Sequence, residues 1–343
     1  MKEEQMIGLM LEQIPQPGFL VQADKIIQVN QAAQALLLSP GMVFSPMLEV
    51  GAEEYAEFQA GQMYLTLAAA GQHWGAAVTR MEDQDLILLE PREDPEEFRS
   101  MALISMELRK PLMQAIASAQ HLADGGSAEM NRSLMQMQRL VNNLSDIGRY
   151  LAGCRPELQD INALLLEQFE KAAALAQERV SISYTGLRQP LFCLLDPEQL
   201  ERAVWNILSN CIRFTPTGGQ IQATLTRKGK RLCLTVQDSG SGIAQDVRGN
   251  LFRQYLRRPG IEDGRYGLGL GLSMIRAVAA NHGGTVLIDS KETGTRIAMT
   301  LEIRENNHST LHSPIFRLDH SGGWDHGLVE LSDCLPAKHY QTL

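Results

Sequence analysis

Two asparagines four residues apart, in the stretch Asn206-Ile-Leu-Ser-Asn210, carry the first chemical signal of this sequence. Residues 197–214 are typical of a helix with Pro197 at its start, so the i, i+4 spacing puts both amides on one face. An amide oxygen is a hard, neutral ligand suited to Mg²⁺, which takes few protein ligands and completes its shell with water and phosphate oxygens. Arg213, one turn later, could meet a phosphate. The alternative is an ordinary polar helix surface.

Two glycine-containing stretches offer further chemistry. In Asp238-Ser-Gly240-Ser-Gly242, at the end of an expected strand, the carboxylate can accept a hydrogen bond from an exocyclic amine such as that of adenine. The run Gly267-Leu268-Gly269-Leu270-Gly271 precedes an expected helix, where glycine-freed amides and a helix N-terminus favour phosphate. Residues 251–264, between the two, are expected to form either a lid over a nucleotide or a plain surface loop.

The order and content of these stretches resemble the ATP-binding domain of sensor histidine kinases, within the wider ATPase superfamily that includes the gyrase B subunit. The resemblance runs through "DPEQLERAVWNILSNCIRFTPTGG", "VQDSGSGI", "LFRQYLR", "GLGLGLSMI" and "GTRIAMTL". It implies a Bergerat-type α/β sandwich at residues 156–304 that uses ATP and Mg²⁺. The alternating helix and strand patterns of this part agree with mixed α/β connectivity.

The resemblance also implies roles for individual residues. Asn210 would coordinate Mg²⁺, with Asn206 as a second ligand beside the phosphates. Arg213 would contact phosphate, Phe214 would pack beside the nucleotide, and Asp238 would bind the adenine amine. Thr295 would lie near the adenine. The glycines expected to shape the pocket and lid are Gly240, Gly242, Gly267, Gly269 and Gly271, and Leu268 and Leu270 between them are also expected to bind ATP. Two departures from the family are the cysteine at 211, where alanine is usual, and the arginine at 213, where lysine is common. Because gyrase-like ATPases hold a glutamate base at the position of Asn206, phosphoryl transfer is expected rather than fast hydrolysis.

The stretch SMELRKPL at residues 105–112 is similar to the family's phosphoacceptor motif His-Glu-Leu-Arg-Thr-Pro-Leu but lacks its reactive positions. Met106 stands at the acceptor position, and its thioether gives no stable phosphoryl adduct, so self-phosphorylation at the usual site is not expected. Glu107 remains as a weak catalytic candidate. Lys110 replaces the threonine or asparagine that positions water for phosphatase activity, and its ammonium only donates hydrogen bonds. His121 lies about 22 Å farther along the expected helix.

Residues 93–155 are predicted to form an antiparallel helical hairpin. Apolar side chains recur at alternating spacings of four and three over residues 101–122 and again over 134–151, and DGGS separates the two runs. One hairpin cannot bury two such stripes well, so we expect a dimeric four-helix bundle. A monomer that packs the stripes on its own domains is the alternative. Ser105 lies on the first stripe, facing the neighbouring helix, and is disfavoured as a substitute acceptor.

The two ends of the chain are less specific. Residues 1–92 show a strand pair, a short helix and three further strands, an order that resembles a PAS sensor domain. Residues 305–343 form a tail that holds five of the eight histidines, with no spacing typical of a metal site. We expect this tail to be flexible, although "SPIFRL" and "LVELSDCLP" are apolar enough to dock on the chain's own ATP-binding domain.

Composition narrows the functional classes. The net charge of −9 and the lack of a long basic block argue against nucleic acid as a direct partner. The sequence contains no run of 18 apolar residues, so membrane insertion is not expected. The acidic N-terminus does not suggest a signal peptide. The five dispersed cysteines fit a reducing compartment, so we expect a cytoplasmic protein.

The sequence therefore predicts an α+β multidomain protein of the histidine-kinase type. The first hypothesis is an ATP-dependent phosphotransferase, a homodimer or a heterodimer with a related kinase, that acts on a partner's histidine and signals to a response regulator. The second is a catalytically inactive, nucleotide-binding scaffold, a pseudokinase, that regulates a partner kinase or response regulator. A serine kinase similar to anti-sigma factors is disfavoured, because those lack the hairpin and the sensor.

Overall fold

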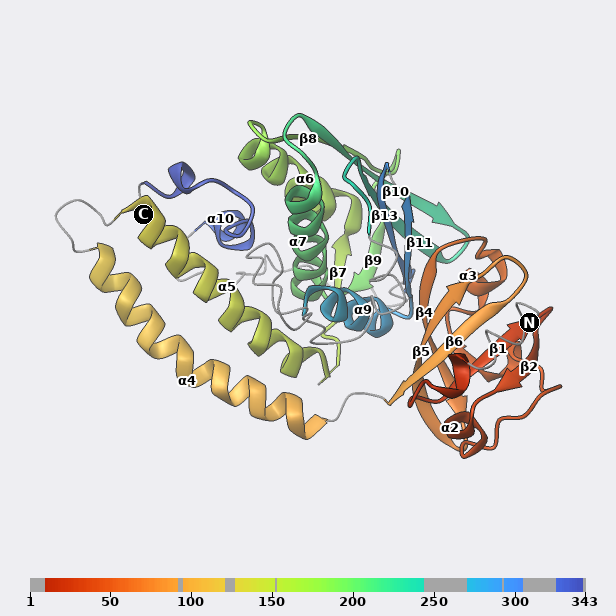
Figure 1. Cartoon of the computed structure of the whole chain (residues 1–343). Helices are drawn as coiled ribbons and strands as arrows, with labels where there is room; N and C mark the ends of the chain where they lie inside the picture. Colours follow the sequence, from red (N-terminus) through yellow and green to blue (C-terminus); the bar gives the residue numbers. More distant parts are fainter. Residues whose placement is uncertain are drawn as a thin grey trace.

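The computed structural model describes residues 10–91, 95–120, 127–151, 153–243, 270–291, 293–304 and 325–341 of the chain. These residues form a mixed α/β structure around one large sheet. In Figure 1 a strand-rich N-terminal part lies at one end and a pair of long helices at the other, with the central helices and strands between them. No helix among the described residues is long and apolar enough to cross a bilayer.

The N-terminal part is a sheet with the strand order β2-β1-β6-β5-β4, and β3 pairs with β4. Its predicted strand pair is joined by a tight turn in which Ala23 and Asp24 both have positive φ, which suits the twist of a hairpin. The sequence predicts five of the strands but not β3 or α3, which are short and lack a sustained period. The elements are β1 (Gly18–Gln22), β2 (Lys25–Val29), α2 (Gln31–Gln34), η1 (Ser45–Met47), β3 (Leu48–Val50), α3 (Ala52–Glu57), β4 (Gln62–Ala69), β5 (Gln72–Arg80) and β6 (Asp85–Pro91).

The central part is organised around α7 (Pro197–Phe214), which has the predicted bounds. The Asp196 carboxylate caps this helix by accepting a hydrogen bond from the Gln199 amide at 3.0 Å, and Pro197 lies in the first turn. The other elements are β7 (Glu157–Asp160), α6 (Ile161–Ala176), β8 (Val180–Thr185), β9 (Phe192–Leu195), β10 (Gly219–Lys228), β11 (Arg231–Asp238), α9 (Gly271–Asn281), β12 (Val286–Lys291) and β13 (Gly294–Glu302). Of these, the sequence does not predict β7, which pairs with β9 apart from the large sheet.

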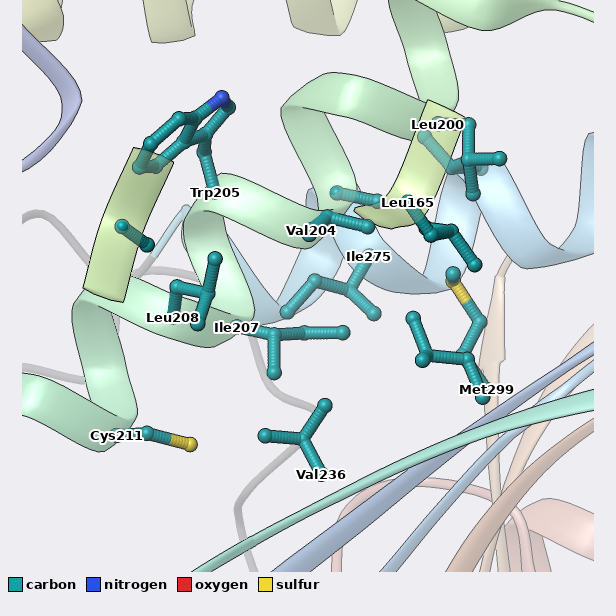
Figure 2. Packing of buried hydrophobic residues seen from close by; sticks show 14 of the residues in the cluster. Leu165, Leu200, Val204, Trp205, Ile207, Leu208, Cys211, Val236, Ile275 and Met299 are labelled. Carbon is teal, nitrogen blue, oxygen red and sulfur yellow. The ribbon is translucent and has the colours of Figure 1, made fainter. Parts of the chain in front are cut away.

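The core of the central part lies between its helices and the strands β8, β10, β11, β13 and β12. Figure 2 shows the apolar face of α7, with Val204 and Ile207, pointing toward Val236 of β11, Ile275 of α9 and Met299 of β13. Apolar residues three or four apart on α7 thus meet alternate residues of the strands. These are the spacings expected for one face of a helix and one face of a strand. This packing fixes the polar face of α7 relative to the end of β11.

Among the described residues, one ladder joins the N-terminal sheet to the central sheet. Residues 62–64 of β4 pair antiparallel with residues 286–288 of β12. Around this ladder the Thr285 hydroxyl donates to the Tyr64 carbonyl, and the Thr300 hydroxyl donates to the Glu54 carboxylate at 2.8 Å. The sequence contains no signal for this joint, because an edge strand does not specify its partner.

The expectation of a flexible tail is wrong for residues 325–341. This segment contains α10 (His326–Glu330) and η2 (Ala337–Tyr340) and docks against α5 (Ala128–Leu151), α6 and α7. Its apolar side chains at positions 329, 331, 334, 335 and 340 are buried in the core of the central part. Docking of "LVELSDCLP" on the chain's own domain, the alternative expectation, is therefore correct, whereas "SPIFRL" lies outside the described residues.

The two long helices, α4 (Pro95–Gln120) and α5, lie side by side, and α4 continues through Pro111 (Figure 1). The predicted stripe of α4 is divided: Ser105 and Leu112 are buried, whereas Leu108 is exposed. On α5 the predicted stripe residue Val141 belongs to the core shared with the central part. The chain thus covers part of each stripe by itself and leaves the rest exposed.

Candidate functional site

The polar face of α7 carries the predicted metal and phosphate residues. Asn206 is buried, and its amide nitrogen donates to the Arg202 carbonyl at 2.9 Å, one turn back on the same helix. Asn210 is half-buried, and no hydrogen bond engages its amide within the described residues. An amide oxygen without a protein partner suits a cation. Phe214, at the end of the helix, is exposed.

The glycine at the start of α9 lies against Asn206. A Cβ added to Gly271 would come within 3.0 Å of the Asn206 amide oxygen, closer than side chains ordinarily pack. Leu270, the residue before it, is buried. The predicted asparagine and this predicted glycine, 65 positions apart in the numbering, therefore meet between α7 and α9.

The Asp238 carboxylate, at the end of β11, is held in a fixed orientation. Its Oδ1 atom accepts hydrogen bonds from the Gly240 amide at 2.8 Å and from the Thr295 amide at 3.1 Å. The structure thus brings together three residues that the sequence singled out. Phe214 joins them through its backbone, because a Cβ on Gly240 would lie 2.6 Å from the Phe214 carbonyl oxygen.

Cys211 is a fifth member of this cluster, and from the sequence it is treated only as a change of side-chain size. Its buried thiol hydrogen-bonds to the Asp238 carboxylate. Burial raises the pKa of Asp238 above its ordinary value, and the hydrogen bonds from the two amides and the thiol lower it in part. Burial also raises the pKa of the Cys211 thiol, with the nearby carboxylate adding to the effect. A thiol can donate a hydrogen bond, so a cysteine one turn before Phe214, a predicted site residue, was the available sequence signal that position 211 belongs to the site.

The far end of β12 fixes the loop that follows Asp238. The Ser290 hydroxyl accepts a hydrogen bond from the Ile243 amide at 2.7 Å. Gly242 has a φ of +70°, and an added Cβ would collide with the Lys291 carbonyl, so this position requires glycine. The strand that pairs with the N-terminal sheet at its start thus supports the candidate site at its end.

Arg213 has a partner that the sequence does not predict. Its Nη2 atom donates to the Asp333 carboxylate of the docked tail at 2.7 Å. The remaining predicted positions Gly267, Leu268 and Gly269, the expected lid at residues 251–264, and His121 all lie outside the described residues.

The degenerate acceptor stretch lies on α4, which packs on α5 at the side away from the central part (Figure 1). Met106 is 64% exposed, and Glu107 and Lys110 are also exposed. Ser105 is fully buried, as its position on the stripe predicts. Arg109 donates to the Asn142 side chain of α5 at 3.1 Å and so helps to hold the two helices together.

Comparisons with known proteins agree with this arrangement. Residues 195–305 match the family described as "Histidine kinase-, DNA gyrase B-, and HSP90-like ATPase". The chain is 29% identical over 199 residues to "Sensor protein RstB" of Escherichia coli, covering 56% of this chain and 45% of that protein. It is 28% identical over 215 residues to "Hybrid signal transduction histidine kinase D" of Dictyostelium discoideum, covering 56% of this chain and 14% of that protein. The chain therefore spans less than half of either relative.

A solved structure shares the fold. The crystal structure of full-length ShkA in complex with AMPPNP superposes with a TM-score of 0.51 at 22% identity, over 62% of this chain and 47% of that one. At this identity the likeness concerns the fold alone. Taken with the sequence relatives, the arrangement of α7, β11 and α9 agrees with the family match: residues 195–305 form a histidine kinase-, DNA gyrase B- and HSP90-like ATPase domain, and the chain is similar to sensor histidine kinases.

Proposed function

We propose that this protein is a signal-transduction protein that binds Mg-ATP and transfers the γ-phosphoryl group to a histidine of a partner subunit. The observation that carries the proposal is the Asp238 carboxylate, oriented by two backbone amides beside the polar face of α7. A fixed anion of this kind favours a ligand with an exocyclic amine, because the hydrogen bond is charge-assisted. ATP would supply both the adenine amine and the phosphoryl group.

The side chains on α7 fit the metal that ATP brings. The Asn210 amide, which has no hydrogen bond to the part of the chain that the structure describes, is a suitable oxygen ligand for Mg²⁺, which retains water and phosphate oxygens as its other ligands. Asn206 offers a second amide oxygen, facing Gly271 at the start of α9. Neither residue can act as a base that activates water, which favours phosphoryl transfer over rapid hydrolysis.

The phosphoryl acceptor is proposed to lie on another chain. Met106 has no atom that forms a stable phosphoryl adduct, and the buried Ser105 hydroxyl is inaccessible to a nucleotide. A partner imidazole would attack the γ-phosphorus, forming an N–P bond while the bond to the bridging oxygen breaks and ADP leaves. The exposed Leu108 and Met137 support a second helical hairpin as the neighbour, in a homodimer or in a heterodimer with a related kinase. The phosphorylated partner would then signal to a response regulator.

The N-terminal part is proposed to be a PAS-like sensor. Its strand order, β2-β1-β6-β5-β4, and the helices between β2 and β4 support this assignment. The ladder between β4 and β12 supports direct transmission of a sensor change to the strand whose Ser290 holds the loop after Asp238. The proposed units are residues 1–92, 93–155, 156–304 and 305–343.

A second candidate is a catalytically inactive scaffold that binds nucleotide and regulates a partner kinase or response regulator. Two observations favour it: the acceptor and phosphatase positions are Met106 and Lys110, and Arg213 is engaged by Asp333 rather than being open to a phosphate. In this case nucleotide and sensor ligand would change only the conformation of the protein.

Incubation with ATP labelled at the γ-phosphate, first with the protein alone and then with candidate partner kinases, separates the two functions. Acid-labile label on a partner alone supports phosphoryl transfer, and the label should disappear when Asp238→Asn protein is used. Tight nucleotide binding without label on any chain supports the scaffold. Acid-labile label on this chain alone would show that the acceptor assignment is wrong, and His121→Ala would test that residue. Failure to bind ATP would exclude both functions.

A further inference from the structure

The tail segment of residues 325–341 lies at the interface between the helical pair, α4 and α5, and the central part. From α5, Arg132 and Gln136 donate to the Ser332 carbonyl at 2.9 and 3.2 Å, and Asn131 donates to the Tyr340 carbonyl at 3.0 Å. From the end of α6 onward, Arg179 donates to the Cys334 carbonyl at 2.7 Å. The segment is therefore held from both sides of this interface.

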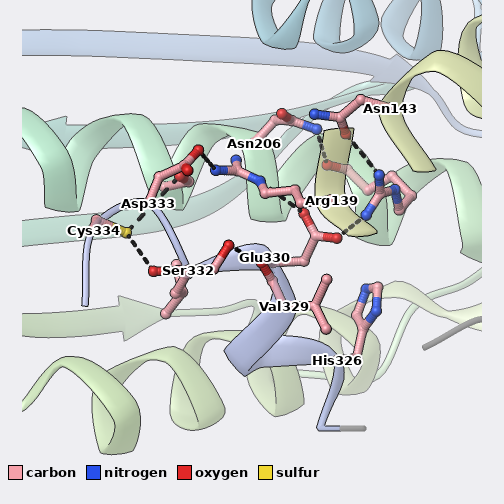
Figure 3. A network of polar contacts seen from close by, with 12 residues as sticks. Arg139, Asn143, Asn206, His326, Val329, Glu330, Ser332, Asp333 and Cys334 are labelled. Carbon is pink, nitrogen blue, oxygen red and sulfur yellow. Dashed lines mark hydrogen bonds and ion pairs between the residues drawn. The ribbon is translucent and has the colours of Figure 1, made fainter. Parts of the chain in front are cut away.

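The first of two carboxylates in this segment, that of Glu330, connects α5 to α7. Glu330 is fully buried and forms ion pairs with Arg202 of α7 and Arg139 of α5 (Figure 3). Arg202 also donates to Asp146 of α5 at 2.6 Å and to Asn143 at 2.7 Å. Removing a charged member of this buried network would weaken the compensation of the remaining charges, so this part of the contact is structural.

The second carboxylate, that of Asp333, lies at the edge of the interface between the helical pair and the central part. Asp333 is 28% exposed and accepts from Arg139 of α5 at 2.6 Å, as Figure 3 shows. It also accepts from Arg213 of α7 at 2.7 Å. Both bonds end on the same oxygen, Oδ2. The Asp333 carboxylate thus pairs with the Arg213 guanidinium, which the family resemblance assigns to a nucleotide phosphate.

We propose that residues 325–341 are an intrachain latch that opposes nucleotide binding, with Asp333 competing with phosphate for Arg213. This inference rests on the proposed Mg-ATP site. When the latch is docked, Arg213 is neutralised by Asp333 and α5 is fastened to α7. When phosphate takes Arg213, Asp333 keeps only Arg139, and the docked segment is weakened. Because the coupling between two ligands of one group is reciprocal, whatever releases the latch tightens nucleotide binding, and nucleotide loosens the latch.

The first measurement is the affinity of the full-length protein for a fluorescent ATP analogue, methylanthraniloyl-ATP. Asp333→Asn keeps the shape of the side chain and removes its charge, so we expect about 5- to 10-fold tighter binding, the lower range for a charged hydrogen bond at a partly exposed site. Glu178→Gln is the matched control. It removes the exposed ion pair between Glu178 and Lys338 of the same segment without touching Arg213, and its affinity should stay within about twofold of wild type. Equal or weaker binding by Asp333→Asn would overturn the latch.

The second measurement uses the wild-type protein and does not depend on the folding of a variant. Backbone amides of residues 325–341 should exchange with deuterium several-fold faster in saturating Mg-ATP than without nucleotide, whereas amides of β10 and β11 should not. Unchanged or slower exchange in the segment, with ATP bound, overturns the latch but leaves the nucleotide site intact. If neither wild type nor Asp333→Asn binds the analogue, the latch and the proposed function both fail.

Discussion

The guanidinium of Arg276 on α9 lies over the ring of Tyr64 on β4, with its central carbon 3.9 Å from the ring centroid. The same side chain donates to the Glu90 carboxylate at 3.1 Å. One arginine of the central part is therefore shared by two strands of the N-terminal part, beside the β4–β12 ladder. Because α9 begins at the glycine that lies against Asn206, this contact and the candidate nucleotide site are on the same helix.

Removal of this contact should destabilise the joint. Arg276→Ala would remove a cation that pairs with the largely buried Glu90 and would also remove the cation–π contact, so the free energy of unfolding should fall by about 2–4 kcal/mol. Urea denaturation measures the change. The control is Arg304→Ala, since Arg304 pairs with Glu302 at an exposed site and should cost less than about 1 kcal/mol. Equal effects of the two substitutions would contradict a structural role for the Arg276 contact.

Restoring the acceptor tests whether the remaining machinery can transfer phosphate. Met106→His places an imidazole next to Glu107 on the exposed face of α4, and we expect it to gain acid-labile label from γ-labelled ATP where wild type has none. Met137→His is the matched control, because Met137 is also exposed, at 52%, but lies on α5 outside the acceptor stretch. Label on both variants would indicate unspecific transfer. Label on neither, with ATP bound, would favour the scaffold.

The charge of Asp238 should carry much of the nucleotide affinity. Asp238→Asn retains an oxygen that can accept from the Gly240 and Thr295 amides but loses the anion, so methylanthraniloyl-ATP should bind about 10- to 100-fold more weakly. Fluorescence titration measures the loss, and circular dichroism checks the fold. Asp289→Asn on β12 is the same substitution at an aspartate outside the cluster and should leave the affinity unchanged. A normal affinity for Asp238→Asn would refute the adenine assignment.

His282 should make the stability depend on pH. Its Nε2 atom accepts from the Asp196 amide at 2.9 Å, and its Nδ1 atom donates to the Val278 carbonyl at 2.7 Å, so the neutral ring is the one that fits. Burial lowers the pKa of His282 below its ordinary value. The unfolded chain therefore binds a proton at higher pH than the folded chain does. The stabilisation is fully present above the unfolded pKa of about 6.5 and is lost as the pH falls from there through the folded pKa.

The measurement is the free energy of unfolding at several pH values between about 7.5 and 5. Wild type should lose stability on acidification with a slope of up to about 1.4 kcal/mol per pH unit from this group. His282→Gln should be less stable at the upper end and show a shallower slope. A slope unaffected by His282→Gln would assign the pH dependence to other groups.

The sequence by itself determined most of the local elements and singled out several residues of the candidate site. The apolar spacing and Pro197 predict α7 at its observed bounds, and alternation predicts most strands, because these patterns depend on neighbours within a few residues. The same helix spacing places Asn206 and Asn210 on one face. The strand end identifies Asp238.

Only the tertiary structure decided how these parts are joined. Arg213 and Asp333 are 120 positions apart, and no local pattern distinguishes the tail carboxylate from a phosphate as the partner of that arginine. The thiol of Cys211 at Asp238 and the pairing of β4 with β12 are of the same kind. The sequence shows what kind of group a donor, a charge or a strand edge can bind. Which group actually contacts it depends on how the whole chain packs.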